Sequence, residues 1–225
     1  MLQVHHLERS RSQRVLWLLE ELGVPYELVR YARDPKTLRA PPELARVHPL
    51  GKSPILVHNQ RTLAESGAIV EYVVEHFDTG YRLSPPPEPI DADERLRYRY
   101  WLHYAEGSAM PPLLLSLVFA RLRAAPVPFF VRPVVRGIAD KAMSGFVSPQ
   151  LRTHFDYIEQ ELGSRPWFAG SRFTAADIQM SFPLEAAAAR SGLPLPNVRA
   201  FLGRIHERSA YRRAVEAGGP FEVPG

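Results

Sequence analysis

The chain contains no cysteine among its 225 residues, and its lysines are confined to Lys36, Lys52 and Lys141. The absence of cysteine excludes disulfide bonds, cysteine-ligated metal sites and a CxxC redox centre. It is compatible with the reducing cytosol, where disulfides rarely persist. Any sulfur chemistry that the protein performs must therefore use the sulfur of a bound molecule.

A continuous run of positive charge is also missing. Lysine and arginine number 28 against 24 aspartates and glutamates, so the formal net charge is only +4. The arginines are interleaved with acidic and apolar positions instead of forming one basic stretch. Since a nucleic-acid-binding surface needs such a concentration of positive charge, we expect no nucleic-acid partner.

Long apolar segments are missing as well. The longest apolar stretch, Leu113–Ala120, is too short to cross a membrane and contains Ser116. Residues Met1–Ser10 carry charge early and lack the apolar core of a secretory signal. We therefore expect a cytoplasmic protein without a membrane span.

The common motifs of phosphate and dinucleotide binding are absent, and neither Ser10 nor Ser12 lies in a GxSxG elbow. The neighbouring His5 and His6 suggest a metal at first sight. Adjacent residues of a strand point to opposite faces, however, so these two imidazoles are unsuited to a shared ion. We expect no metal site and no serine nucleophile of the triad type.

The first 80 residues alternate between strand and helix patterns. The expected elements are a strand at 2–5, a helix with an apolar stripe from Val15 to Leu22, a strand at Tyr26–Tyr31, a short helix from Pro41, strands at Ile55–Val57 and Thr62–Leu63, and a helix through Val70–Phe77. Gly23 and Pro25 end the first helix. The order βαβ-α-ββα is the minimal thioredoxin-like layout.

A proline-rich segment then divides the chain. Residues 81–90 include Pro85-Pro86-Pro87 and predict a semi-rigid linker. Strand patterns largely stop beyond it, and helical patterns follow. We expect a thioredoxin-like domain at 1–80 and an all-helical domain at 91–225, that is, an α/β domain followed by a helical bundle.

Proline interrupts the helical half at two places. A helix is expected from Asp91 to Gly107, and Pro111-Pro112 should kink or end it. The segment 126–133 should interrupt the helices again, either as a plain loop or as a border of a substrate pocket. Further on, Thr174 and Asp177 have the spacing of a capping box at the start of a helix.

Two serines near strand and helix ends are candidates for ligand binding. Ser10 lies where a strand leads into a helix, so its hydroxyl is either a plain N-cap or a donor in the positive field of the helix. Ser53 precedes Pro54 at the start of a strand. A cis bond there would turn the backbone N–H and C=O of Ser53 outward to pair with a peptide-like ligand, whereas a trans proline would merely start the strand.

A third candidate opens the helix that follows the fourth strand. Ser66 can cap this helix, and the free N–H groups of its first turn suit a carboxylate. Glu65 can pair with an ammonium group. Taken alone, a simple cap beside a solvated acid explains the two residues equally well.

These features are weak singly, but their order and spacing resemble the glutathione transferase superfamily. The resemblance rests on Ser10 with Arg14, on His48–Pro54 (HPLGKSP), on Leu63–Ser66 (LAES) and on Phe173–Asp177 (FTAAD). It covers essentially the whole chain. The stretches Arg14–Leu19 and Ala40–Leu44 are similar to a theta-like, serine-type subgroup of fungi and bacteria.

The resemblance implies a homodimeric detoxification enzyme that conjugates reduced glutathione, its cosubstrate, to apolar electrophiles. It implies that Ser10 donates a hydrogen bond to the glutathione sulfur and stabilises the nucleophilic thiolate. Arg11 and Ser12 are alternates for the place nearest the sulfur. Ser53 would pair through its backbone with the cysteinyl part of glutathione, beside a cis Pro54.

The ends of glutathione follow from the same resemblance. Lys52 would lie near the glycyl carboxylate, Glu65 would meet the γ-glutamyl ammonium, and Ser66 would meet the γ-glutamyl carboxylate. The electrophile would lie against the helical domain, near Tyr104 and Met110.

Two other functions use the same fold. Glutathione-dependent reduction of peroxides or disulfides would need the same site, with the sulfur of glutathione supplying the electrons. A non-catalytic binding module would keep the fold and lose the activation of the thiol.

Overall fold

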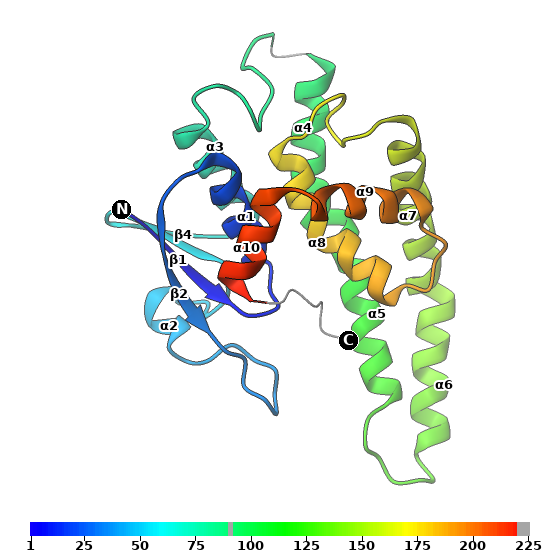
Figure 1. Cartoon of the computed structure of the whole chain (residues 1–225). Helices are drawn as coiled ribbons and strands as arrows, with labels where there is room; N and C mark the ends of the chain where they lie inside the picture. Colours follow the sequence, from blue (N-terminus) through cyan, green and yellow to red (C-terminus); the bar gives the residue numbers. More distant parts are fainter. Residues whose placement is uncertain (90–91, 220–225) are drawn as a thin grey trace.

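The computed structural model describes residues 1–89 and 92–219. A four-stranded sheet lies on one side of the molecule and a set of long helices lies on the other (Figure 1). The strands are β1 (Leu2–Leu7), β2 (Tyr26–Tyr31), β3 (Ile55–His58) and β4 (Arg61–Ala64), in the spatial order β2-β1-β3-β4. The expected thioredoxin-like sheet followed by a helical domain is therefore confirmed.

The pairing of β1 fixes the geometry of the sheet. β1 runs parallel to β2 and antiparallel to β3, with His5 opposite Ile55 in the second pair. The parallel pair requires a crossover, which α1 (Gln13–Leu22) supplies. Gly23 ends α1 in the left-handed conformation, with φ 69°, as expected for a C-terminal glycine.

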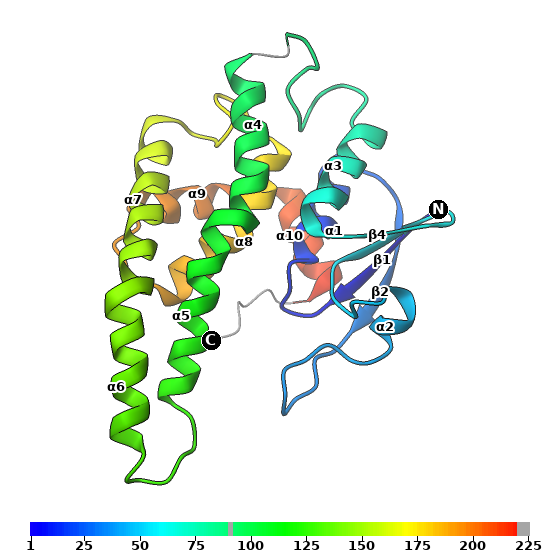
Figure 2. The same ribbon diagram turned by 180° about the vertical axis from the view of Figure 1, so that it is seen from behind.

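Both faces of the sheet are covered. On one face, α1 packs with α3 (Ser66–Phe77) and with α10 (Ser209–Gly218), the last helix among the described residues (Figure 2). On the other face, Leu44 of the short helix α2 (Leu44–Val47) packs against Leu7 and Ile55. Helix α10, from the second half of the sequence, therefore packs against the first domain.

Close packing at the end of α10 depends on Gly218. A Cβ atom there would lie 2.5 Å from Oε1 of Gln13 and 2.8 Å from Cδ1 of Leu16. Because those contacts are shorter than atoms tolerate, a side chain at 218 would have to displace Gln13 and Leu16, and glycine lets the last turn of α10 lie against α1 without that shift. The backbone of α10 thereby comes within hydrogen-bond distance of the sheet, where His6 Nε2 lies 3.0 Å from the Gly218 carbonyl oxygen.

The second half consists of helices among the described residues. They are α4 (Asp93–Tyr104), α5 (Met110–Arg123), α6 (Arg132–Ala142), α7 (Ser148–Ser164), α8 (Ala175–Arg190) and α9 (Pro196–His206). Helix α8 is buried along most of its length and contacts α1, α3, α4 and α9. The expected end of the linker at Ile90 and the expected helix start at Asp91 lie outside the described residues.

Of the two outcomes expected at Pro111-Pro112, a kink or an end, the end is wrong, because helical structure continues through these prolines. A π-helical turn, Ala105–Ala109, joins α4 to α5, and the prolines occupy the first turn of α5. Proline is accepted there because the wider π-turn shifts the hydrogen-bond register, so a missing N–H costs little. The long helical path carries Glu106 on the π-turn, facing the first domain.

The interruption of the helices expected at residues 126–133 is correct only in part. Helix α5 ends at Arg123, and α6 begins at Arg132 with Pro133 in its first turn. The connection is therefore 124–131, and α6 was not expected from the sequence. Within the described residues, no helix combines the length and the apolar character that a membrane crossing requires.

The expected capping box at the start of α8 is confirmed. The Thr174 side chain and the Asp177 side chain each accept from the other's backbone, and Asp177 also accepts a bond of 2.9 Å from the N–H of Phe168. Asp177 is fully buried, so these donors replace the water that the carboxylate loses. The box fixes both the start of α8 and the loop before it.

Candidate functional site

A small cavity of about 230 Å³ lies where the sheet domain meets the π-turn of the helical half. Its walls bring together five residues expected from the sequence, Lys52, Ser53, Pro54, Glu65 and Ser66. The remaining lining residues are Arg11, His48, Leu50, Ala64 and Glu106. Three loops meet here: the end of β1, the approach to β3 and the start of α3.

The Ser53–Pro54 peptide bond is cis, as expected. The hydroxyl of Ser53 accepts a bond of 3.2 Å from the N–H of Leu7 and donates one of 3.2 Å to the carbonyl of His5. The Ser53 side chain thus hydrogen-bonds two backbone groups of β1, the Leu7 N–H and the His5 carbonyl. Among the described residues, no backbone partner takes the N–H or C=O of Ser53, so both are available to an extended ligand.

Glu65 holds an unusual backbone conformation immediately before α3. Its φ of 70° and ψ of 117° lie in a region that non-glycine residues rarely occupy. Such strain costs about 1–3 kcal/mol and persists where the surroundings enforce it, most often at functional sites. The conformation leaves the Glu65 carboxylate exposed at the cavity wall.

Ser66 is the first residue of α3 and is almost fully buried. Its hydroxyl oxygen accepts from Arg14 Nη2 at 2.9 Å and from Gln179 Nε2 at 3.2 Å. Because both partners are donors, the proton of the Ser66 hydroxyl is left for another acceptor. Together with the unpaired N–H groups of the first turn, it forms a site for an anionic oxygen.

Arg14 links the two halves of the protein behind the cavity. The guanidinium is buried and donates to the Gln179 carbonyl at 2.5 Å and to Glu106 Oε1 at 2.6 Å. Arg11 Nε holds the other Glu106 oxygen at 2.8 Å. Burial raises the pKa of Glu106, but Arg14 and Arg11 outweigh it and hold that pKa below its ordinary value.

Glu106 is a site residue that the sequence did not indicate. It is a single acid in a helical stretch, and no motif marks it. Its place becomes visible only when the π-turn brings it against Arg11 and Arg14.

A second buried chain of hydrogen bonds begins at His6. Its Nε2 lies 3.0 Å from the carbonyl oxygen of Gly218, which can only accept, so Nε2 carries the proton. Burial lowers the pKa of His6 to about 4, and the ring is therefore neutral at pH 7. In the neutral ring Nδ1 is an acceptor, and the Ser12 hydroxyl donates to it at 2.8 Å.

The direction of the next bond follows from that assignment. Ser12 has given its single proton to His6, so its oxygen accepts from the Ser10 hydroxyl at 2.8 Å. The oxygen of Ser10 accepts in turn from the Ser12 N–H at 3.2 Å. In this state the hydroxyl proton of Ser10 points into the protein.

The three candidates for the place nearest a ligand sulfur are thus distinguished. Ser12 is completely buried, with both of its polar functions committed to the interior. Ser10 is 6% exposed and lies behind the cavity wall, its oxygen 3.5 Å from that of Ser53. Arg11 lines the cavity itself.

The two residues expected at the electrophile are not brought to this cavity. Tyr104 lies in an aromatic cluster with Trp101 and Tyr157, and its hydroxyl is 2.6 Å from His154 Nδ1. Met110 is buried in the main core. Neither is among the lining residues.

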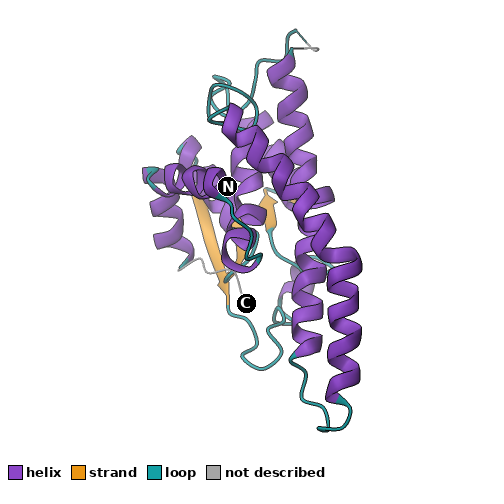
Figure 3. Ribbon diagram, turned by 90° about the vertical axis from the view of Figure 1, so that its right-hand side faces the viewer, coloured by secondary structure: helices purple, strands orange, loops and turns teal. Residues whose placement is uncertain are grey.

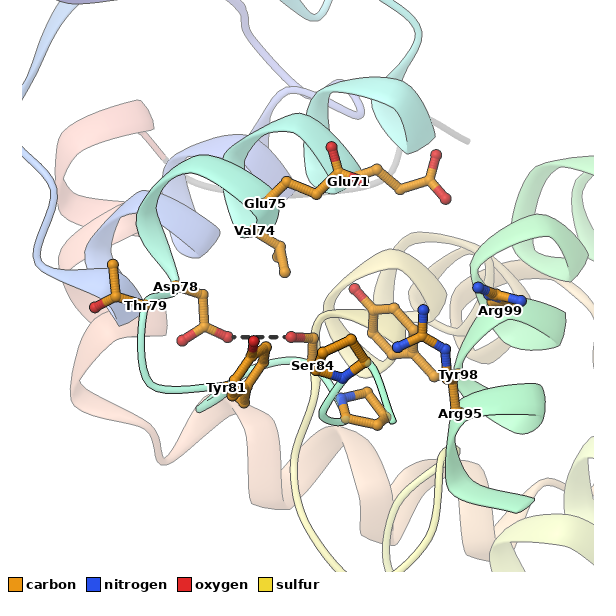
Figure 4. A pocket seen from close by; sticks show the side chains of 12 residues that line it. Glu71, Val74, Glu75, Asp78, Thr79, Tyr81, Ser84, Arg95, Tyr98 and Arg99 are labelled. Carbon is orange, nitrogen blue, oxygen red and sulfur yellow. Dashed lines mark hydrogen bonds between the residues drawn. The ribbon is translucent and has the colours of Figure 1, made fainter. Parts of the chain in front are cut away.

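A larger cleft of about 450 Å³ lies elsewhere, between α3, the proline-rich segment and α4 (Figure 4). Glu71 and Glu75 line its α3 wall, and Arg95 and Arg99 line its α4 wall. No ion pair joins the two walls among the described residues. The residues expected to bind a ligand are all outside this cleft.

Two family models match the chain. Residues 3–75 match the glutathione S-transferase N-terminal domain, and residues 147–204 match the glutathione S-transferase C-terminal domain. The first match contains every cavity residue except Glu106.

The chain is also similar in sequence and in structure to known glutathione S-transferases. The chain is 39% identical to glutathione S-transferase 3 of Schizosaccharomyces pombe, over 96% of this chain and 87% of that protein. It is also 39% identical to glutathione S-transferase 1 of Saccharomyces cerevisiae, over 84% and 82% respectively. A crystal structure of a glutathione S-transferase from Actinobacillus pleuropneumoniae superposes with a TM-score of 0.81 at 30% identity and covers 99% of this chain and 95% of that one.

Proposed function

This chain belongs to the glutathione S-transferase family and uses glutathione as its cosubstrate, and we propose that the 230 Å³ cavity holds the tripeptide. The observation that carries the proposal is that Lys52, the unpaired backbone of Ser53 and the Glu65-Ser66 segment at the start of α3 all line one cavity. The cavity combines a cation, an unpaired backbone edge and a helix N-terminus. A peptide with carboxylates at both ends needs these three features.

We propose one orientation for the bound tripeptide. The γ-glutamyl carboxylate meets the free proton of Ser66 and the first turn of α3, while its ammonium meets Glu65. The cysteinyl backbone pairs with the N–H and C=O of Ser53, and the glycyl carboxylate lies near Lys52. Each charged end of glutathione then faces a group of opposite charge or a positive helix end.

In the proposed reaction, the sulfur of glutathione lies at the Ser10 side of the cavity. When the thiol loses its proton to solvent, the Ser10 hydroxyl turns from the Ser12 oxygen and donates to the thiolate. A bond to an anion is stronger than the neutral bond it replaces, so the exchange favours the thiolate and lowers the thiol pKa. Ser10 forms no covalent bond in this step.

Arg11 assists from the cavity wall. Its guanidinium lies 4.9 Å from the centre of the Phe182 ring on α8 and is held by Glu106. A fixed positive charge near the sulfur adds to the stabilisation of the thiolate. The thiolate then attacks an apolar electrophile lying on the helical side, and its lone pair forms the carbon–sulfur bond. In a substitution the leaving group departs with its bonding electrons; in an addition the electrons of the double bond move to the neighbouring carbon, which takes a proton from solvent.

The binding proposal is tested by calorimetric titration with reduced glutathione. We expect the wild-type protein to bind and Ser66→Ala to bind more weakly, because the carboxylate loses its hydroxyl donor. Ser144→Ala, at an exposed serine outside the cavity, serves as the matched control and should bind like wild type. Equal affinity in Ser66→Ala and wild type would place the γ-glutamyl end elsewhere.

We further propose a homodimer, in which the cleft of Figure 4 forms part of the contact. Its α3 wall is acidic and its α4 wall is basic, so two copies related by a two-fold axis present opposite charges to each other.

Residues 1–80 would bind glutathione, residues 81–90 would link the domains, and residues 91–225 would form the electrophile side. We place the enzyme in the cytoplasm, as a detoxification transferase.

A further inference from the structure

Helices α5 and α6 form a hairpin that reaches beyond the rest of the protein. Among the described elements, none lies beside the lower half of the pair, and its connection lies at the far end of the molecule (Figures 1 and 3). The connection is residues 124–131, between Arg123 and Arg132. The hairpin therefore presents its tip to the surroundings, away from both domains.

The tip carries two of the most exposed large apolar side chains in the described protein. Phe129 is 80% exposed and Phe130 is 69% exposed. The two rings contact each other edge to face, with centroids 5.6 Å apart. Val134 and Ile138, one turn apart on α6, extend the apolar surface up the hairpin. Exposed large apolar side chains gathered on one part of a surface in this way mark an interaction site.

A positively charged hollow lies directly beside the tip. It has a volume of about 240 Å³ and is lined by Arg123, Arg132 and Arg136 together with small apolar residues of the connection. Asp140 pairs with Arg123 at 3.0 Å. Within residues 1–89 and 92–219, no carboxylate pairs with Arg132 or Arg136. The hollow therefore presents two guanidinium groups that no carboxylate of the described residues neutralises, and such groups suit a phosphate.

We propose that this hairpin tip docks on an anionic lipid bilayer. Phe129 and Phe130 enter the boundary of the acyl chains, and the phosphate of a lipid headgroup occupies the hollow of Arg132 and Arg136. Paired aromatic tips flanked by arginines suit this surface because it offers an apolar interior directly beneath a layer of negative charge.

The charge of the hairpin also argues against a second copy as the occupant. Five cations, Arg121, Arg123, Arg132, Arg136 and Lys141, face one carboxylate, Asp140, between residues 121 and 141. Two such tips would repel each other. The acidic and basic cleft of Figure 4, in contrast, is complementary to itself.

Docking in this manner would hold the enzyme at a source of apolar compounds, with the cavity at the opposite end of α5 from the membrane. Helix α5 begins at Met110, directly after the π-turn that carries Glu106, so continuous helical structure connects the hairpin to the site. Apolar electrophiles partition into bilayers. The docking proposal itself depends only on the hairpin and is independent of the role of any cavity residue.

Flotation with vesicles tests the proposal on the full chain. The probes are vesicles of phosphatidylcholine alone and of phosphatidylcholine with phosphatidylserine. We expect wild type to float only with the anionic vesicles, and less so as salt rises. Two double variants test the two parts of the tip: Phe129→Ser with Phe130→Ser, and Arg132→Gln with Arg136→Gln. Each should lower the bound fraction by about tenfold or more, the first because it removes the apolar side chains that enter the bilayer and the second because it removes two charges near the anionic surface.

A matched control comes from the other end of the hairpin. Phe146 is 59% exposed but lies on the π-turn that joins α6 to α7, so Phe146→Ser should float like wild type. Transferase activity without vesicles should be unchanged in all variants, which separates this proposal from that of the cavity.

Three results would overturn the docking proposal. The first is absence of binding to anionic vesicles. The second is displacement by inorganic phosphate with unchanged binding of the phenylalanine variant, which would indicate a soluble anion site. The third is a fall in molar mass of the phenylalanine variant by light scattering without any vesicle binding, which would make the tip a contact between copies.

Discussion

The hydroxyl oxygens of Ser10 and Ser12 lie 2.8 Å apart, and the proton between them belongs to Ser10. This direction follows from His6, whose Nε2 donates to the Gly218 carbonyl and whose Nδ1 accepts from Ser12. The candidate donor for the sulfur is therefore held inward until a ligand competes for its proton. Removal of the Ser10 hydroxyl and removal of the Ser12 hydroxyl should therefore shift the pKa of the bound thiol in opposite directions.

Ser10→Ala should raise the pKa of bound glutathione thiol and lower kcat/KM by up to about 10²-fold, the scale of one lost charge-stabilising donor. Ser12→Ala should lower that thiol pKa, because Ser10 loses its inward acceptor and turns toward the sulfur. Titration of the thiolate absorbance of bound glutathione gives both values. The control for the fold is an unchanged circular dichroism spectrum.

Wild-type turnover in Ser10→Ala would move the role to Arg11, the candidate that lines the cavity. In that event Arg11→Gln should raise the thiol pKa. A fall in turnover in Ser12→Ala as large as that in Ser10→Ala would contradict the outward turn proposed for Ser10.

His6 should make stability depend on pH. Burial lowers its pKa from 6.5 to about 4, so between these values the unfolded chain binds a proton that the folded chain does not. The free energy of unfolding should therefore decrease as pH falls from about 6.5 toward 4. Chemical denaturation of wild type and His6→Asn across this range should show a smaller slope in the variant, and equal slopes would contradict a buried neutral ring.

Loss of the Glu106 carboxylate should weaken the link between the domains. Glu106→Gln leaves Arg14 buried beside a neutral amide, and hydrogen bonds to charged groups contribute about 1.5–3 kcal/mol. Because the folded pKa of Glu106 is depressed, its contribution is present at neutral pH and is lost as pH falls through that pKa.

Urea denaturation at pH 7 and at acid pH checks the Glu106 prediction. Asp140→Asn, at the exposed pair with Arg123, is the matched control and should change stability by less than about 1 kcal/mol. A Glu106 variant that unfolds at the same urea concentration as wild type would show that Arg14 is satisfied by Ser66 and Gln179 alone.

The capping box should contribute measurably to folding. Asp177→Ala removes the acceptor for the N–H groups of Phe168 and Thr174 in a fully buried place. We expect a loss of about 2 kcal/mol or more, since a lost cap costs about 1 kcal/mol and buried unsatisfied donors cost more. Thermal unfolding measures the loss, and Asp34→Ala, at an exposed turn, is the control.

The charge pattern of the α3–α4 cleft predicts a rescue experiment for the dimer. Glu75→Arg and Arg99→Glu should each weaken the dimer, because each places like charges across the two-fold contact. The double variant should recover it, since opposite charges face each other again. Light scattering across a dilution series measures the mass, and a wild-type monomer at micromolar concentration would refute the dimer.

Several elements of the fold were predictable from local patterns. The strand Tyr26–Tyr31 matches its expected bounds, and Gly23 ends α1 in the left-handed conformation that a glycine favours. The capping box of Thr174 and Asp177 forms as its spacing indicates. These features depend on residues within one or two turns of each other, so the sequence contains the whole interaction.

Other features depend on contacts that no local pattern contains. Pro111 and Pro112 predicted a kink or an end of the helix, yet the preceding π-turn accommodates them within a continuous helical path. Helix α6 was not expected, because the prolines before it resemble a loop. Tyr104 and Met110 lie in the interior and not at the cavity, because the faces of a helix are chosen by its neighbours.

The sequence by itself determined the family, the thioredoxin-like order of elements and the residues at three loop ends. Only the tertiary structure decided how these residues act together. Arg14 finds Glu106, Ser66 and Gln179 across separations of 52 to 165 residues, and His6 meets Gly218 across 212. The physical reason is that a buried polar group must be satisfied by whatever donor or acceptor folding places beside it, wherever that partner lies in the chain.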